Sequence, residues 1–472
     1  MTNNYLIAGI ALLLFGACKS PTPATSAALK QPAEVFSKNG LLEITLRPVE
    51  GRLQLDGKEY TAWMYNGSYI PPLLHLRPGD TLRVHLVNGL SMETNLHFHG
   101  FDVSPLGKSD NVFRIGNPGD TLDYEVILSK EHDAGTFWYH PHPCGKSEQQ
   151  VFLGMSGGII VEGLLDELPK EFRNLKDYTM LLKDIQPIES QKKTILCGVG
   201  TGVQEVYEFD SEKTTQRTIN GQINPVINMQ PGETQIWRIS NVGANIYYNI
   251  HLEGHQLYQI GEDGGYYKEV KARDSILMPP GSRIELLVQA KQAGTYKLKT
   301  LAMSTGSAGD DYPEVTLATL VTNGTTIQPL TLPTKLNDKL TDLRTKTITG
   351  KRVFSFTEKS DPDAFFINGR QFNMDSTDTK VKLGSIEEWT LVNATDEMHC
   401  FHIHQFDFQV VEINGKSISF NGTNDVVNMP PRSTIKLLMP FTEDYMVGKF
   451  VYHCHILAHE DRGMMQTIEV VK

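Results

Sequence analysis

Four His-x-His pairs are the residues whose types and spacing best suit chemistry. They are His97-Phe98-His99, His140-Pro141-His142, His402-Ile403-His404 and His453-Cys454-His455. Fifteen histidines in 472 residues would give about 0.5 such pairs by chance. Residues i and i+2 of a β-strand share a face, so each pair presents two imidazoles to one site. Eight imidazoles brought together would hold several metal ions, and imidazole suits copper, zinc, iron and nickel alike.

The pair His453-Cys454-His455 distinguishes among these metals. In a strand its two histidines face one way and Cys454 faces the other. Other ligand types stand nearby in the sequence: His399, His459 and Met464. Two imidazoles, a thiolate and a thioether are the ligands of a blue-copper electron-transfer site. One strand would therefore join a thiolate copper to a cluster held by histidines.

The segments that must position these residues recur three times along the chain. Each copy has an Asn-Gly turn, a strand led by glycine and a closing asparagine. The glycines (Gly79, Gly232, Gly384) lie 153 and 152 residues apart, as do the asparagines (Asn88, Asn241, Asn393). His97 follows Asn88 by nine residues and His402 follows Asn393 by nine, whereas the middle copy has a single His251 nearby. Three copies of one domain explain this repeat, and only the outer two carry His pairs.

Each copy is predicted to be an antiparallel β-sandwich. Short alternating runs rich in Val, Ile, Leu, Thr and Tyr are separated by Asn-Gly, Pro-Gly and other glycine turns. The fold class is therefore all-β, with three consecutive sandwich domains. We place them at residues 39–165, 175–325 and 345–472, with a short helix at 166–172.

The composition excludes some function classes. The chain carries 55 acidic and 44 basic residues, a net charge of -11, whereas nucleic-acid binding needs a basic face. We therefore expect no nucleic-acid partner. Five cysteines in 472 residues do not make a disulfide scaffold.

The N-terminus is typical of an exported protein. Residues 1–18 are predicted to be an export signal, because the apolar run from Leu6 to Phe15 is too short to span a bilayer. Small residues precede Cys18, as in a bacterial lipoprotein signal, although an ordinary cleaved signal stays open. Residues 19–38 are predicted to be a flexible tether. We expect location in the bacterial cell envelope, periplasmic or anchored only through a lipid on Cys18.

The histidine motifs together resemble the multicopper oxidase family of laccases and bacterial cuprous oxidases. The resemblance covers nearly the whole mature chain and implies three cupredoxin-like Greek-key β-sandwich domains. It implies four copper ions per chain, with ligands in the first and third domains. The implied ligands are His399, Cys454, His459 and Met464 for type 1 copper, His97 and His402 for type 2 copper, and His99, His140, His142, His404, His453 and His455 for the type 3 pair.

Further roles also follow from the resemblance. Asp110 and Glu460 stand where the family has acidic residues that relay protons, and Cys454 would transfer electrons. Asp396 and Glu397, just before His399, are predicted to lie near the donor substrate, although a polar loop is the other interpretation. Cys400 replaces a proline that is common in the family, and Cys144 follows His142 by two. A Cys144–Cys400 disulfide is left open.

The predicted activity is that of a laccase-like oxidase. It would couple one-electron oxidation of phenols, aromatic amines or low-valent metal ions to four-electron reduction of dioxygen to water. Three alternatives remain: a dedicated cuprous oxidase in copper tolerance, a non-enzymatic copper-binding envelope protein, and a copper nitrite reductase, which has similar domains but a different ligand set. The fifteen methionines are scattered and form no methionine-rich insert, which disfavours the first alternative. A monomer is favoured, with the oligomeric state otherwise open.

Overall fold

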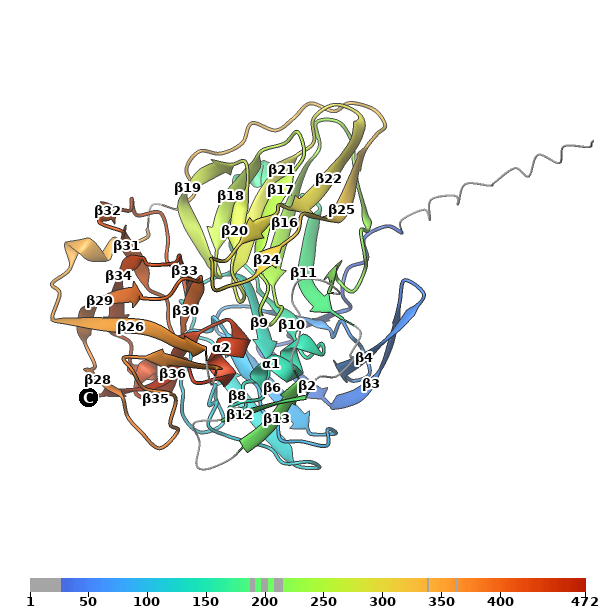
Figure 1. Ribbon diagram of the computed structural model, residues 1–472. Coiled ribbons are helices and arrows are strands. Elements are labelled where there is room, and N and C mark those ends of the chain that lie inside the picture. Colours follow the sequence, from blue (N-terminus) through green and yellow to red (C-terminus); the bar gives the residue numbers. More distant parts are fainter. Residues whose placement is uncertain (1–26, 187–191, 197–202, 208–214, 338, 361–362) are drawn as a thin grey trace, which may run out of the picture.

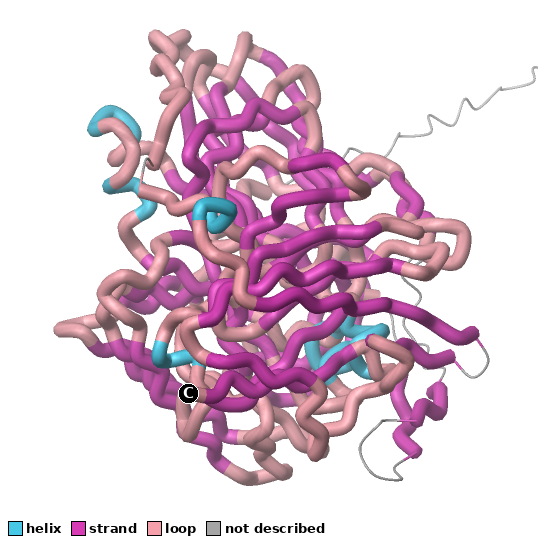
Figure 2. Tube along the Cα trace, turned by 90° about the vertical axis from the view of Figure 1, so that its left-hand side faces the viewer, coloured by secondary structure: helices cyan, strands magenta, loops and turns pink. Residues whose placement is uncertain are grey.

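Three lobes of β-sheet form the structure, a computed structural model in which residues 27–186, 192–196, 203–207, 215–337, 339–360 and 363–472 are described (Figure 1). The predicted export signal, including Cys18, lies outside the described residues. The view turned by 90° shows mostly strand and loop with little helix (Figure 2). Among the described residues, no helix has the length and apolar character needed to cross a membrane. The all-β prediction is confirmed.

The first lobe contains a five-stranded sheet, β1-β5-β10-β9-β7, a three-stranded sheet, β2-β6-β8, and the hairpin β3-β4. Its elements are β1 (Glu34–Phe36), β2 (Leu41–Leu46), β3 (Pro48–Leu55), β4 (Lys58–Tyr65), β5 (Leu73–Leu76), β6 (Thr81–Val87), β7 (His97–His99), β8 (Thr121–Ile127), β9 (Gly135–His140), α1 (Ser147–Phe152) and β10 (Gly157–Val161).

The second lobe contains sheets β14-β11-β16-β21-β18-β19 and β15-β25-β22-β17-β20, with the small pair β23-β24. The separate pair β12-β13 lies away from these sheets, at the level of the first lobe (Figure 1). The strands of this part of the chain are β11 (Asp177–Ile185), β12 (Lys192–Leu196), β13 (Val203–Tyr207), β14 (Gln216–Ile219), β15 (Val226–Met229), β16 (Thr234–Asn241), β17 (Tyr248–Leu252), β18 (Leu257–Glu262), β19 (Gly265–Arg273), β20 (Ile276–Met278), β21 (Arg283–Gln289), β22 (Gly294–Thr300), β23 (Met303–Ser304), β24 (Asp311–Tyr312) and β25 (Val315–Thr322).

The third lobe contains sheets β27-β26-β29-β34-β31-β32 and β28-β36-β35-β30-β33. Its elements are β26 (Gly350–Ser360), β27 (Asp363–Ile367), β28 (Thr379–Lys382), β29 (Ser385–Asn393), β30 (His399–Ile403), β31 (Gln409–Ile413), β32 (Lys416–Ser417), β33 (Val426–Met429), β34 (Thr434–Phe441), β35 (Gly448–Cys454), α2 (Leu457–Asp461) and β36 (Met465–Val471).

The threefold repeat corresponds to one strand and one corner in each lobe. Strands β6, β16 and β29 are the repeated segments, and each lies inside its sheet. At their ends, the Asn88, Asn241 and Asn393 side-chain amides each donate to one backbone carbonyl in the following loop and to a second carbonyl farther along the chain. These asparagines therefore satisfy buried carbonyls at equivalent corners, which explains their constant spacing.

The sheets are mixed, which corrects the purely antiparallel prediction. Parallel pairs join β2 to β6, β11 to β16 and β26 to β29 in the three lobes. Parallel neighbours cannot be joined by a hairpin, so the chain crosses to the other sheet between them. Residue alternation along a strand does not reveal the direction of its partner.

Two segments between or before the predicted domains also differ from expectation. Within the predicted tether 19–38, Leu29 is buried and its N–H donates to Val226 O at 2.8 Å. Strand β1 then pairs with β5, so this part is packed on the lobes because its backbone completes their hydrogen bonding. The predicted helix at 166–172 is two separate 3-10 turns, the second beginning after Pro169, since proline lacks the N–H that a continuous helix needs.

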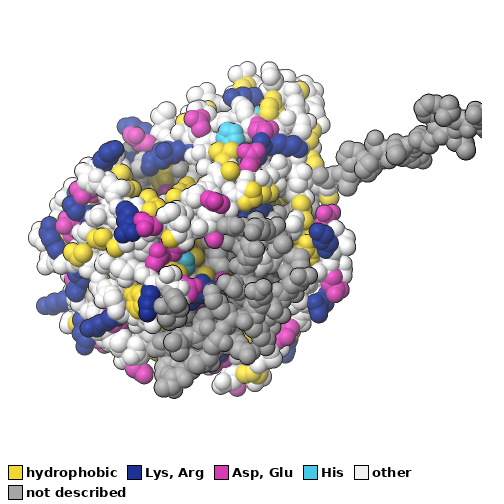
Figure 3. Space-filling view, in the orientation of Figure 1, with side chains coloured by type: hydrophobic (Ala, Val, Ile, Leu, Met, Phe, Trp, Pro, Cys, Tyr) yellow, Lys and Arg dark blue, Asp and Glu magenta, His cyan; other side chains and the backbone are white. Residues whose placement is uncertain are grey.

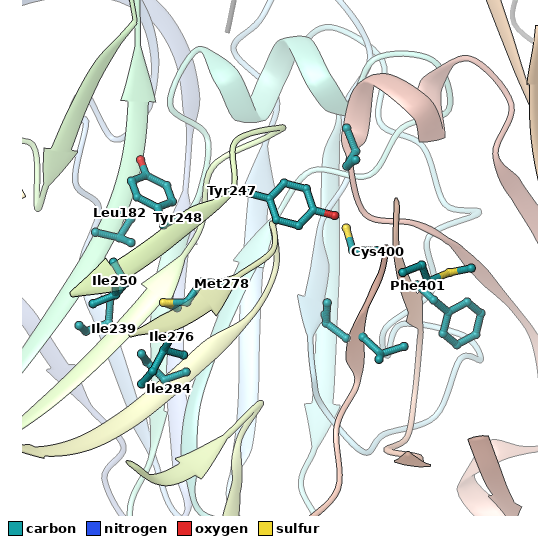
Figure 4. Packing of buried hydrophobic residues seen from close by; sticks show 14 of the residues in the cluster. Leu182, Ile239, Tyr247, Tyr248, Ile250, Ile276, Met278, Ile284, Cys400 and Phe401 are labelled. Carbon is teal, nitrogen blue, oxygen red and sulfur yellow. The ribbon is translucent and has the colours of Figure 1, made fainter. Parts of the chain in front are cut away.

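One hydrophobic core continues from the second lobe into the third. Tyr247 and Tyr248 pack among buried aliphatic side chains of the second lobe, and Cys400 and Phe401 belong to the same cluster. The Tyr247 hydroxyl is directed toward the Cys400 sulfur across the junction (Figure 4). Shared apolar burial therefore fixes these two lobes against each other.

Candidate metal centre

Five of the eight histidines lie on two pairs of adjacent strands, and the other three, His142, His404 and His455, follow within two residues of a strand end. In the first lobe β7 pairs with β9 in a register that sets His97 opposite His140. In the third lobe β30 pairs with β35, which sets His402 opposite His453. Residues opposite each other on antiparallel strands share a face, so each lobe presents four imidazoles. Contacts between the two sets of imidazoles confirm the prediction that the outer domains face each other through these pairs.

The eight imidazoles form one buried cluster between the lobes. The Nε2 atoms of His142 and His404 lie 3.2 and 3.1 Å from Nε2 of His453. Nε2 of His455 lies 3.2 Å from Nδ1 of His99. None of the eight side chains is more than 3% exposed. Ring nitrogens from both lobes thus converge on a few points closed to solvent.

The hydrogen bonds orient ring nitrogens toward the interior of the cluster. The Nδ1–H groups of four histidines donate to oxygen atoms of the surrounding chain: His97, His140, His402 and His453. This leaves Nε2 for the cluster, and Nε2 of His97, His140 and His402 has no hydrogen-bond partner among the described residues. Nδ1 of His404 and of His455 is likewise unpartnered. Buried nitrogens without partners are costly, and a bound metal would satisfy them.

Burial keeps seven of the eight imidazoles neutral, as metal ligation requires. Burial lowers the pKa of His140 to about 3 and that of His142 to about 4. Burial, with repulsion from neighbouring imidazoles, also holds the pKa well below its usual value in His97, His99, His402, His404 and His455. The donor set therefore fits a cluster of metal ions.

A second site lies on the other side of β35. Nδ1 of His399 and Nδ1 of His459 are 3.1 Å apart, and Cys454 Sγ lies 3.7 Å from each. Met464 is fully buried in the same core, and its carbonyl accepts from Cys454 N–H at 3.0 Å. Two imidazoles and a thiolate at these distances suit copper, and the thioether is available from the chain beside them.

A short helix that sequence reasoning missed brings His459 back to Cys454. After β35 the chain enters α2, which lies beside α1 where the first and third lobes meet (Figure 1). The Asp461 carboxylate in α2 accepts the N–H groups of Ser147 and Glu148 in α1. Five residues are too few to show a helical period, so no pattern in the sequence predicts this element.

Asp110 contacts the cluster directly. Its two carboxylate oxygens lie 3.0 and 2.9 Å from Nδ1 of His97, and Oδ1 also accepts from Phe98 N–H. The Gln405 amide donates to Oδ2 at 2.8 Å. Burial raises the pKa of Asp110 to about 7 despite these donors. Asp110 therefore orients His97 and is close enough to exchange a proton with the cluster.

Glu460 lies on the third-lobe side of the same cluster. Its Oε2 atom is 3.0 Å from Nδ1 of His453 and 3.6 Å from Nε2 of His142. Burial opposes ionisation, but His142 and His453 favour it more strongly, and the pKa of Glu460 lies at about 2. Both predicted relay carboxylates thus contact cluster histidines, one from each outer lobe.

The two carboxylates predicted near the donor have different surroundings. Glu397 Oε1 lies 3.4 Å from Nε2 of His459. Asp396 instead points outward and forms a bidentate pair with Arg432, both distances being 2.6 Å. Only Glu397 is therefore adjacent to the second site.

A cavity of about 610 Å³ opens beside His459. Its lining includes Asp310, Glu358, Asp363, Phe365, Glu397 and His459. The ring of Phe365 stacks on that of His459 with centroids 4.1 Å apart. Acidic side chains with a histidine among them are visible near the centre of the face in Figure 3. A small molecule or ion in this cavity would touch the imidazole edge opposite Cys454.

The structure does not form the Cys144–Cys400 disulfide that the sequence left open. Cys144 packs with Val112 and Phe372 between the outer lobes. The Cys400 thiol lies in the core shared by the second and third lobes, 4.0 Å from Pro280 O. The two sulfurs belong to different clusters, a separation that sequence spacing does not reveal.

Comparison with known proteins identifies the chain's relatives. Three sequence models of multicopper oxidases match residues 49–165, 178–325 and 345–472. A multicopper oxidase from Staphylococcus aureus is 29% identical over 447 residues, which cover 92% of this chain and 90% of the relative. Among solved structures, a Campylobacter jejuni multicopper oxidase described as a metallo-oxidase gives a TM-score of 0.80 at 24% identity, covering 95% of this chain and 96% of that one. A laccase from Pediococcus acidilactici gives 0.79 at 25% identity, covering 95% of each chain.

Proposed function

Because this chain belongs to the multicopper oxidase family, and is a copper-dependent oxidoreductase with dioxygen as its acceptor, we propose the copper sites and donors that follow. Four copper ions are held per chain, one outside the cluster and three within it. Type 1 copper is held by His399, Cys454, His459 and Met464. Type 2 copper is held by His97 and His402, and the type 3 pair by His99, His140, His142, His404, His453 and His455.

The bound coppers supply one-electron transfer and the four-electron reduction of dioxygen to water. The chain supplies a short covalent path between the two sites, because Cys454 is bonded to both His453 and His455. It also supplies proton-holding groups within reach of the cluster, the Asp110 and Glu460 carboxylates. The buried position of all eight histidines excludes bulk water from the reacting oxygen species.

Donors approach through the cavity beside His459. Phenols, aromatic amines and low-valent metal ions are the proposed classes, since an outer-sphere donor needs only to reach the imidazole edge. Acidic side chains in the lining, among them Asp310, Glu358 and Asp363, favour donors that carry positive charge. We further infer export to the bacterial cell envelope, either periplasmic or held by a lipid on Cys18; mass spectrometry of the mature N-terminus distinguishes the two.

The observation that carries the proposal is the convergence of Cys454 Sγ with Nδ1 of His399 and of His459, back to back with the eight-histidine cluster. The test is metal analysis with visible spectroscopy of protein loaded with Cu(I) and exposed to air. We expect four coppers per chain and an intense thiolate-to-copper absorption near about 600 nm. Oxygen uptake with a phenol or ferrous donor should accompany it. A colourless protein that binds one metal per chain would refute the proposal.

A further inference from the structure

The second lobe, which carries no His pair, extends an arginine to the edge of the histidine cluster. Arg283 on β21 is fully buried, and its Nη1 and Nη2 atoms donate to both carboxylate oxygens of Asp425 at 2.7 and 2.6 Å. Asp425 immediately precedes β33 of the third lobe. A bidentate arginine–carboxylate pair fixes the orientation of both groups.

Asp425 in turn contacts two cluster histidines from different lobes. Its Oδ1 atom lies 3.2 Å from Nε2 of His99, whose Nδ1 faces His455. Its backbone carbonyl accepts from Nδ1 of His402 at 2.8 Å. These contacts set which nitrogen each ring offers to a metal: Nδ1 in His99 and Nε2 in His402.

The guanidinium also connects the second lobe to the first. Nε of Arg283 donates to Thr136 O at 3.0 Å, four residues before His140 on β9. A Cβ on Gly100, the residue after His99, would collide with Nη2 of Arg283 and approach Oδ2 of Asp425. The glycine therefore leaves the space that the arginine fills. One side chain thus touches segments that carry ligands in both outer lobes.

A second acid balances the buried charge of this arginine. Asp263 lies 3.6 Å from Nη1 of Arg283 and accepts its backbone N–H at 3.1 Å. It also accepts from the Asn424 side chain and from Val426 N–H, on either side of Asp425. The loop that carries Asp425 is therefore held at three consecutive residues by the second lobe.

From these contacts we propose that Arg283 is a positioning residue for the copper cluster: through Asp425 it fixes the ring orientations of His99 and His402. The middle lobe contributes this positioning in place of ligands. The inference rests on the proposed function, because it assumes that copper occupies the cluster.

The test compares Arg283→Lys with Arg238→Lys in the copper-loaded full chain. Arg238 is a matched control: it is 2% exposed, pairs with Asp177 at 2.9 Å, and lies on β16 beside β21. Each protein is titrated with a copper chelator, while the absorption near about 600 nm reports type 1 copper and electron paramagnetic resonance reports type 2 copper.

We expect Arg283→Lys to bind cluster copper about tenfold more weakly, as loss of outer hydrogen bonds to ligands generally does. Its type 2 resonance should change, while the type 1 absorption per chain stays unchanged. Arg238→Lys should keep the wild-type spectra and chelator midpoint. Asp425→Asn, which keeps the backbone carbonyl bonded to His402, should give the same selective weakening through His99.

Two results overturn the inference. The first is that Arg283→Lys and Asp425→Asn both keep the wild-type ratio of cluster copper to type 1 copper and the wild-type resonance of type 2 copper. The second is a parallel loss of both copper types in both variants, which would make Arg283 a general stabilising residue. A wild-type protein without cluster copper would instead refute the proposed function itself.

Discussion

Glu397 Oε1 lies 3.4 Å from Nε2 of His459, on the ring edge opposite Cys454. The carboxylate is 8% exposed and lines the cavity beside the ring. Burial and the neighbouring Glu358 raise the pKa of Glu397 to about 10, so this carboxyl group is protonated near neutral pH. A donor in that cavity therefore meets an ionisable carboxyl group beside an imidazole that leads to the proposed type 1 site. The neighbouring Asp396 is turned away to Arg432 and provides a natural comparison.

Removing this ionisable carboxyl group should separate the classes of donor. Glu397→Gln is expected to raise KM for ferrous ion about tenfold, equivalent to about 1.4 kcal/mol, because a cation that displaces the proton of Glu397 gains a charged partner that glutamine cannot provide. KM for a neutral phenol should stay nearly unchanged. Asp396→Asn is the control and should alter neither value. Equal effects of Glu397→Gln on both donors, in steady-state kinetics, would contradict a charge-specific role.

A pH-dependent effect on stability is expected at Asp133, away from the metal sites. Burial raises the pKa of Asp133 to about 6, above its value of about 4 in an unfolded chain. The folded state therefore binds more protons than the unfolded state between these values, and its stability falls as pH rises from about 4 to about 6. Asp133→Asn should raise the free energy of unfolding by about 1–2 kcal/mol at pH 7.5 and by almost nothing at pH 4.

Urea unfolding at the two pH values measures this difference. Asp123→Asn is the control and should change the free energy of unfolding in the opposite direction, because His85 and Lys108 lower the pKa of Asp123. Since Asp123 is 45% exposed, its loss should destabilise the chain by less than about 1 kcal/mol at pH 7.5. A pH-independent effect of Asp133→Asn would show that its burial does not control its ionisation.

The sequence predicted the cluster well because its signal is geometric. Two-residue spacing places both histidines of a pair on one face, and the constant offset from Asn88 and Asn393 places the pairs on equivalent strands. The alternation around Cys454 likewise predicted two sites on opposite faces of β35. These are local properties of a strand, so they can be read without knowing which strands become neighbours.

What the sequence did not predict depends on long-range packing. Arg283 and Asp425 are single residues, 142 positions apart, with no spacing that marks them. Asp396 and Glu397 are adjacent acids, and only the placement of Arg432 explains why one turns outward. The parallel pairing of β26 with β29 also depends on where the chain crosses between sheets.

Asp110 should affect oxygen reduction rather than donor oxidation. Asp110→Asn keeps a group that accepts from Phe98 N–H but loses the carboxylate beside His97. We expect kcat to fall about 100-fold or more, the usual contribution of a positioned proton-transfer group. Anaerobic bleaching of the type 1 absorption by donor should keep its wild-type rate in stopped-flow measurements. Asp120→Asn, an exposed acid of the same lobe, is the control; slowed bleaching in Asp110→Asn would contradict this assignment.

Replacing Cys454 should remove one copper site and leave the other. Cys454→Ser substitutes a hydroxyl of similar size for the thiolate, between His453 and His455, whose rings point to the opposite face. The absorption near about 600 nm should disappear because it requires a copper–thiolate bond. Copper content should fall by one per chain, while the type 2 resonance remains, since its proposed ligands, His97 and His402, are untouched. Cys144→Ser should keep the full spectrum. If Cys454→Ser still unfolds cooperatively but loses the cluster copper, the two sites on opposite faces of the strand do not bind copper independently.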